Sequence, residues 1–199
     1  AEAFRVLQPE RSADLRRSAE EALEGRLVIS GSAGKTVFVG NPPVWKEIRT
    51  SDTHYGSDLN RMLHWDILSK AFWLSGDPRF ARRMAREALD WIQQCPRPPL
   101  PQNQEQRLFH FYSLEASRVP WHCLNSGIRL FASWRRLVEL CAALPIVTIE
   151  EWKAIGASLR EQAEAILAVS PFLFTDANHN HYLMEMLGVL SYADLFSGD

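Results

Sequence analysis

Asparagine and histidine alternate near the C-terminal end of the sequence, as Asn178-His179-Asn180-His181. The segment enters an apolar stretch, where polar and titratable groups are costly unless they are hydrogen-bonded or used. On a helix, Glu185 would lie one turn after His181 on the same face. This spacing could present an imidazole to a cleft, with a carboxylate beneath it to orient the ring. Such a pair is suited to hydrogen bonding and proton transfer on a bound molecule.

Three interpretations of this segment stand side by side. Asn180 and His181 could cap the helix and bond within the core, which is the commoner role of such residues. They could instead be catalytic. A third possibility is a zinc site made by Asp176, His179 and His181, although histidines two apart suit an extended segment better than one helix face. Gly188 shares the face of His181 and would let another helix approach closely.

A second polar group lies within residues 57–74, a segment that is apolar nearly all round and is expected to form one buried helix. Asn60, Arg61 and His64 occupy a sector of about 100° on its helical wheel. Arg61 could bind a carboxylate through two parallel hydrogen bonds. The alternative is a buried polar network that sets the register of the helix against its neighbours.

The remaining pattern predicts a mainly helical chain. Residues 1–13 are expected to be a loosely ordered lead-in, and residues 26–39 carry the one β signal, a small hairpin. A proline-rich segment begins at Cys95 and predicts a loop of about 20 residues, and loops of that length in a compact domain are often functional. The predicted helices cover residues 14–23, 57–74, 79–94, 124–144, 150–169 and 181–194.

Two local signals set the expected helix ends. Ser75-Gly-Asp-Pro78 combines a helix stop, a cap and a first-turn proline, so the helices on either side should form an antiparallel pair. Thr148-Ile-Glu-Glu151 is a capping box. Consecutive antiparallel pairs without a repeat of fixed length favour a helical toroid or solenoid over a tetratricopeptide or ankyrin array.

Composition narrows the class of protein. The 199 residues, 46% of them hydrophobic, suffice for one packed domain. A net charge of −2 gives no reason to expect a nucleic-acid partner, and no apolar run is long enough to insert into a membrane. Three scattered cysteines predict buried thiols rather than disulfides. Ala1 is not an initiator methionine, so we expect a processed or trimmed product.

Several stretches together resemble one family. They are, in chain order, Trp45, Leu59-Asn-Arg61, His64-Trp65, Ser75-Gly-Asp77, Trp91-Ile92, Trp121, Gly127-Ile-Arg129, Trp134, Asn180-His181, Glu185 and Gly188. Their order and spacing resemble the N-terminal helical domain of heparinase II/III-like polysaccharide lyases, which include alginate lyases. Two positions depart from the family pattern: Asn125 stands where an acidic residue is expected, and the motif reads His179-Asn180-His181 rather than Asn-Asn-His.

The resemblance implies an all-α fold, an incomplete (α/α) toroid that β-sheet domains follow. Residues 1–40 would form the lead-in helix and hairpin, and residues 41–199 the N-terminal part of the toroid domain of a longer lyase. The catalytic tyrosine of the family and a further histidine lie beyond this region, so we expect the fragment to be inactive alone. We expect no cofactor and no metal for this chain, and the resemblance implies a periplasmic or secreted location.

The implied reaction is β-elimination on an acidic, uronate-containing polysaccharide. The resemblance assigns Asn180 and His181 to the uronate carboxylate, with His181 also assisting proton transfer. The other candidate substrate-binding residues are Asn60, Arg61, His64, Trp45, Trp121 and Arg129. Arg129 could alternatively be structural, paired with a carboxylate. Two other functions stay open for the whole chain: a carbohydrate-binding helical module without catalysis, and a helical scaffold for protein partners.

Overall fold

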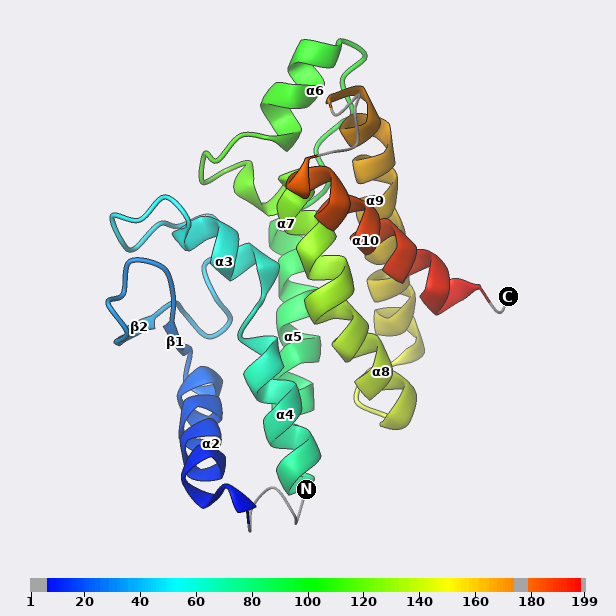
Figure 1. Ribbon diagram of the computed structural model, residues 1–199. Helices are drawn as coiled ribbons and strands as arrows, with labels where there is room; N and C mark the ends of the chain where they lie inside the picture. The colour runs from blue at the N-terminus through cyan, green and yellow to red at the C-terminus, as the bar shows by residue number, and fades with distance from the viewer. Residues whose placement is uncertain (1–6, 174–178, 198–199) are drawn as a thin grey trace.

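The computed structural model describes residues 7–173 and 179–197, and most of them are helical (Figure 1). The α-helices are α2 (Pro9–Leu23), α3 (Tyr55–Arg61), α4 (Trp65–Ser75), α5 (Pro78–Gln94), α6 (Gln104–Phe111), α7 (Cys123–Ile128), α8 (Arg135–Ala143), α9 (Ile149–Leu173) and α10 (Asn180–Phe196). A 3₁₀ turn, η1 (Val119–Trp121), precedes α7, and a π-helical turn, η2 (Arg129–Trp134), joins α7 to α8. The expected all-α class is confirmed.

The N-terminal part contains the predicted hairpin. Strand β1 (Arg26–Val28) pairs antiparallel with β2 (Thr36–Phe38), with Leu27 opposite Val37. The expectation of a loosely ordered lead-in is wrong from Pro9 onward, because α2 begins there with the proline in its first turn. Proline suits that position since its missing N–H would have no helical partner.

The predicted helix over residues 57–74 is two helices. Helix α3 ends at Arg61, and Met62 adopts a left-handed conformation with φ of 57° before α4 begins. That conformation is costly for a residue with a side chain, so the surroundings must favour it. Ser133 of η2 donates its hydroxyl to the carbonyl oxygens of Arg61 at 2.7 Å and Met62 at 3.1 Å. The break therefore rests on tertiary hydrogen bonds to the end of α3.

The junction between α4 and α5 matches its sequence signal. Gly76 takes the left-handed position with φ of 73°, and the Asp77 carboxylate accepts from the Arg79 N–H at 2.9 Å. The two helices lie side by side in Figure 1. Helix α6 interrupts the loop that was expected after Cys95. Asn103 caps the N-terminus of α6, its side-chain oxygen accepting from the Glu105 N–H at 2.8 Å.

Helices α9 and α10 complete the described chain. The Thr148 capping box is present, with the Thr148 N–H donating to Glu151 Oε2 at 2.7 Å and the Glu151 N–H donating to Thr148 Oγ1 at 3.2 Å. Helix α10 crosses α7 closely enough that a Cβ on Gly188 would lie 2.6 Å from the Cα of Gly127. Glycine at both positions thus sets how near α10 comes to the centre of the fold.

A buried ionic network joins α4 and α5. The Glu87 carboxylate accepts from Trp65 Nε1 at 2.6 Å, lies 2.7 Å from His64 Nε2, and pairs with Arg83. Burial acts to raise the pKa of Glu87, but His64 and Arg83 outweigh it and lower that pKa to about 2. The carboxylate is therefore charged in the folded protein well below its ordinary range.

Acid should weaken the fold through Glu87. Because its pKa is lower in the folded chain than the ordinary 4.5, its contribution is complete above pH 4.5 and is lost as pH falls towards 2. Glu87→Gln should cost about 3 to 5 kcal/mol at neutral pH by leaving Arg83 buried without its partner. Urea unfolding at several pH values in this range should show that the free energy of unfolding changes less steeply with pH in the variant than in wild type. The exposed Glu139→Gln is the control, and a slope matching wild type in Glu87→Gln would contradict the assignment.

The three cysteines are free thiols, two of them buried, as predicted. No helix in the described ranges is both long and apolar enough to span a bilayer.

Candidate active site

Arg61, His122 and His181 gather at one end of the helices although they are far apart in sequence. They come from the end of α3, the residue before α7 and the start of α10, which lie together in the upper half of Figure 1. Burial, followed by the nearby His181 and Arg61, lowers the pKa of His122 to about 4. The structure thus brings two of the predicted site residues together with one that was not predicted.

The start of α10 places His181 partly in solvent. His179 caps the helix, with its Nδ1 accepting from the His181 N–H at 3.2 Å, and the two rings meet edge to face at 4.8 Å. Asn180 is the exposed first residue of the helix. Burial is the largest cause that lowers the pKa of His181, followed by His179 and Arg61. The imidazole is therefore held neutral at neutral pH, as a hydrogen-bonding group rather than a fixed charge.

The cation of the group, Arg61, is oriented by a neutral side chain. Its Nε donates to Asn125 Oδ1 at 2.8 Å, and its Nη1 lies 3.8 Å from Asp58. Asn125 is itself fixed, because its amide donates to the Val119 carbonyl at 3.0 Å and to Ser57 Oγ at 3.3 Å. The position where the family pattern suggests an acid thus holds an amide that aims Arg61 without neutralising it.

A second layer lies behind the histidines. The Tyr112 hydroxyl donates to Glu185 Oε2 at 2.8 Å and lies 3.1 Å from Ser170 Oγ, while its ring meets the His122 ring at 5.2 Å. Glu185 is fully buried, and burial raises its pKa. The carboxylate predicted to orient His181 therefore has Tyr112 as a hydrogen-bond partner.

The sequence analysis did not predict Tyr112 or His122 as site residues, and it named Asn125 only as a departure from the family pattern. Tyr112 follows α6 in the segment that was expected to be a functional loop, and the other two residues flank the start of α7. The available signal was the position of His122 next to Trp121, ahead of a helix.

Asn60 and Trp45 are structural in their contacts. The Asn60 amide donates to the carbonyls of Trp45 and Gly56, both at 2.9 Å, and its Oδ1 accepts from Trp91 Nε1 at 2.9 Å. Trp45 is 2% exposed and its Nε1 donates to Asp90 at 2.7 Å. Trp45 was a candidate substrate-binding residue, but it has no exposed face for a sugar, and the polar atoms of Asn60 are all bonded within the core.

Trp121 and Arg129 are also enclosed. Trp121 is 4% exposed and donates to the Cys95 carbonyl at 2.8 Å, so it too lacks a face for a sugar. Arg129 is fully buried, with its Nε donating to Gln162 at 2.8 Å and its guanidinium 4.1 Å from the Trp91 ring centre. Its acceptors are neutral, so the expected pairing with a carboxylate is wrong. His64, the residue before α4, belongs to the buried Glu87 network and not to the Arg61 cluster.

A metal centre finds no support in the described ranges. No group of three or more histidine, cysteine or acidic side chains there could hold an ion. Asp176, the remaining member of the suggested zinc site, lies outside the described residues.

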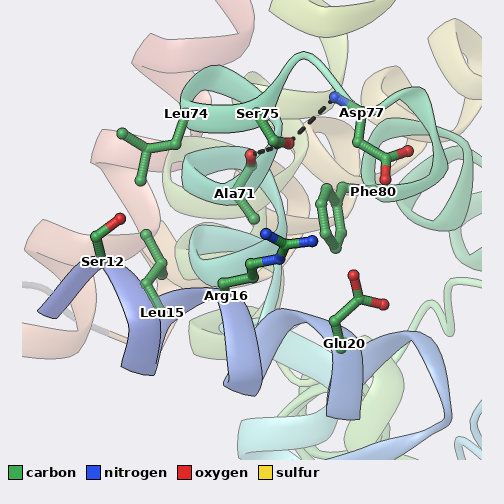
Figure 2. Close-up of a pocket in the computed structure, with 9 residues that line it drawn as sticks. All are labelled: Ser12, Leu15, Arg16, Glu20, Ala71, Leu74, Ser75, Asp77 and Phe80. Atoms are coloured by element: carbon green, nitrogen blue, oxygen red, sulfur yellow. Dashed lines mark hydrogen bonds between the residues drawn. The ribbon is translucent and has the colours of Figure 1, made fainter. Parts of the chain in front are cut away.

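A groove lies elsewhere on the described part of the chain. About 450 Å³ is enclosed between α2 and the α4–α5 junction, with Arg16 and Glu20 on one wall and Leu74 and Phe80 on the other (Figure 2). The two carboxylates on its rim are already paired, since Arg79 bridges Glu20 at 2.9 Å and Asp77 at 2.7 Å. The elements that line this groove, α2 and the α4–α5 junction, lie in the lower half of Figure 1, away from the start of α10.

Comparisons with known proteins support the fold of the chain. The family described as "Heparinase II/III N-terminus" matches residues 10–197. Among solved structures, a heparinase III (the BT4657 gene product with methylated lysines) superposes with a TM-score of 0.71 at 20% identity, over 92% of this chain and 28% of that one. No curated protein sequence matches. The chain spans little more than a quarter of the heparinase III chain, and the shared part is helical and fits the N-terminal part of a toroid. The chain therefore belongs to the heparinase II/III family and forms a polysaccharide-lyase-related helical domain.

Proposed function

We propose that this chain is the N-terminal domain of a lyase that cleaves uronate-containing acidic polysaccharides by β-elimination. Asn180 and His181 hold the uronate carboxylate, and Arg61 meets its charge. The single observation that carries the proposal is the convergence of Arg61, His122 and His181, one cation and two neutral imidazoles, at the start of α10.

The reaction needs such a group of donors. A base removes the proton from C5, the C–H electron pair forms the C4–C5 double bond, and the C4–O bond breaks. The departing oxygen keeps the electron pair of the broken C4–O bond and takes up a proton. Charge builds on the carboxylate oxygens as the C5 proton leaves, and preorganised donors lower the barrier by stabilising that charge. Neutral imidazole and amide groups beside a guanidinium supply these donors without introducing an anion of their own.

The remaining part of the cleft is proposed to come from a C-terminal remainder of the same chain. Helix α10 carries Leu183, Leu187 and Leu190 at helical spacing, and these side chains are 56%, 38% and 63% exposed. An apolar stripe of this kind is typical of a helix that packs against another element. The chain's share of the heparinase III structure is consistent with a following helix covering this stripe.

Ultraviolet absorbance of the unsaturated uronate product tests the proposal. The full-length protein and its His181→Ala variant are compared on heparan sulfate, heparin, hyaluronan, alginate and glucuronan. We expect product from wild type on at least one glycan and its loss in His181→Ala. Binding of an acidic glycan without product formation on any of the five would contradict the proposal and favour a carbohydrate-binding module. A periplasmic or secreted location is part of the proposal, since polymeric glycans lie outside the cytoplasm.

A further inference from the structure

His122 was not predicted as a site residue, but its contacts in the structure distinguish it. Its Nδ1 accepts from the Leu124 N–H at 3.2 Å, so the side chain caps the start of α7. A neutral imidazole has one nitrogen that accepts and one that carries the proton. Because the cap uses Nδ1 as the acceptor, the proton lies on Nε2, which becomes a donor of fixed position.

The ring has little freedom to turn. It is 6% exposed, and the Tyr112 ring meets it edge to face at 5.2 Å. Tyr112 is in turn held by its hydroxyl, which bonds Glu185 at 2.8 Å and Ser170 at 3.1 Å. Glu185 lies one turn after His181 on α10, so the same helix supports both histidines.

The Nε2 donor has no hydrogen-bond partner within the described ranges, and it is not among the fully buried atoms that lack one, so this edge of the ring opens to solvent. A donor held in one position and open on one side can bond a ligand that accepts from it. Arg61 reaches the same end of α7, because its Nε donates at 2.8 Å to Asn125, one turn after His122, and α10, which begins with His181 in its first turn, packs against α7. The ring is neutral at neutral pH, so it can donate while repelling neither the cation nor an anion.

We propose that His122 binds substrate directly, donating Nε2–H to the uronate carboxylate that Arg61 and His181 also contact. The inference rests on the proposed lyase function. It adds a fourth donor, fixed in one tautomer by the backbone of α7, to the carboxylate subsite that Asn180, His181 and Arg61 form. The helix-capping atom and the substrate-binding atom are then different nitrogens of one ring.

Two substitutions separate these nitrogens. His122→Asn keeps a side-chain oxygen near the place of Nδ1, where it can still cap α7, but it has no group near Nε2. His122→Gln reaches the place of Nε2 with an amide N–H and loses the cap. In the full-length enzyme we expect His122→Asn to keep the wild-type Tm and lose about 10- to 100-fold in kcat/KM. His122→Gln should melt lower yet retain more activity than His122→Asn.

The opposite order would overturn the inference. If His122→Asn cleaves as well as wild type, or if activity follows Tm through both variants, His122 serves only as a cap. A wild-type enzyme that cleaves while both variants keep full kcat/KM refutes this inference and leaves the proposed function standing. A wild-type enzyme without product on any uronate glycan refutes the proposed function itself.

Discussion

Arg61→Ala in the full-length lyase is expected to lower kcat/KM by about 100- to 1,000-fold, equivalent to about 3 to 4 kcal/mol of transition-state stabilisation. Arg61 is the cation of the cluster, and the amide of Asn125 orients its Nε at 2.8 Å. Its ion pair with Asp58 is long, at 3.8 Å, so the guanidinium keeps most of its attraction for a substrate carboxylate. Initial rates of product absorbance on the preferred glycan measure the effect.

Two further variants make the Arg61 result specific. Arg61→Lys keeps the charge but loses the planar fork, so it should recover only part of the lost activity. Arg79→Ala removes an exposed arginine that pairs with Glu20 and Asp77, away from the start of α10 in Figure 1, and it should leave kcat/KM unchanged. Arg61→Ala with wild-type kcat/KM and wild-type Tm would remove Arg61 from the substrate site.

Features with a local cause could be predicted from the sequence. The Gly76-Asp77-Pro78 junction and the Thr148 capping box are formed by neighbouring residues, and the structure contains both. The break after Arg61 has a distant cause, because Ser133 of η2 satisfies the carbonyls that a continuous helix would have bonded. A helical wheel cannot include such a partner. The supposed single sector of Asn60, Arg61 and His64 failed for that reason.

The candidate site shows the same division. His181 could be predicted because it begins an apolar helix, and Arg61 because it interrupts one. His122 could not, since its importance comes from the approach of α3 and α10 to the start of α7. Trp45 and Trp121 were substrate-binding candidates that lie outside the predicted helices. In the structure the indole N–H of Trp45 bonds Asp90, that of Trp121 bonds the Cys95 carbonyl, and both rings are buried.

Gly188→Ala is expected to destabilise the protein by about 3 kcal/mol, at the upper end of the usual cost of overpacking. A Cβ at Gly188 would lie 2.6 Å from both the Cα and the carbonyl oxygen of Gly127. Those are backbone atoms, so relief requires α10 and α7 to move apart. The movement would also stretch the hydrogen bond between Tyr112 and Glu185, which lies one turn before Gly188. Urea or thermal unfolding of wild type and variant measures the loss.

Gly156→Ala is the matched control, because it makes the same substitution inside α9 where a Cβ would meet nothing within 4 Å. It should stabilise the chain by up to about 1 kcal/mol through the helix propensity of alanine. Opposite signs for the two variants would locate the effect in the crossing of α7 and α10 rather than in glycine itself. Equal stability of Gly188→Ala and wild type would contradict the close crossing. Since that crossing sets how near the start of α10 comes to α7, and with it His181 to His122, Gly188→Ala should lower lyase activity in the folded enzyme as well.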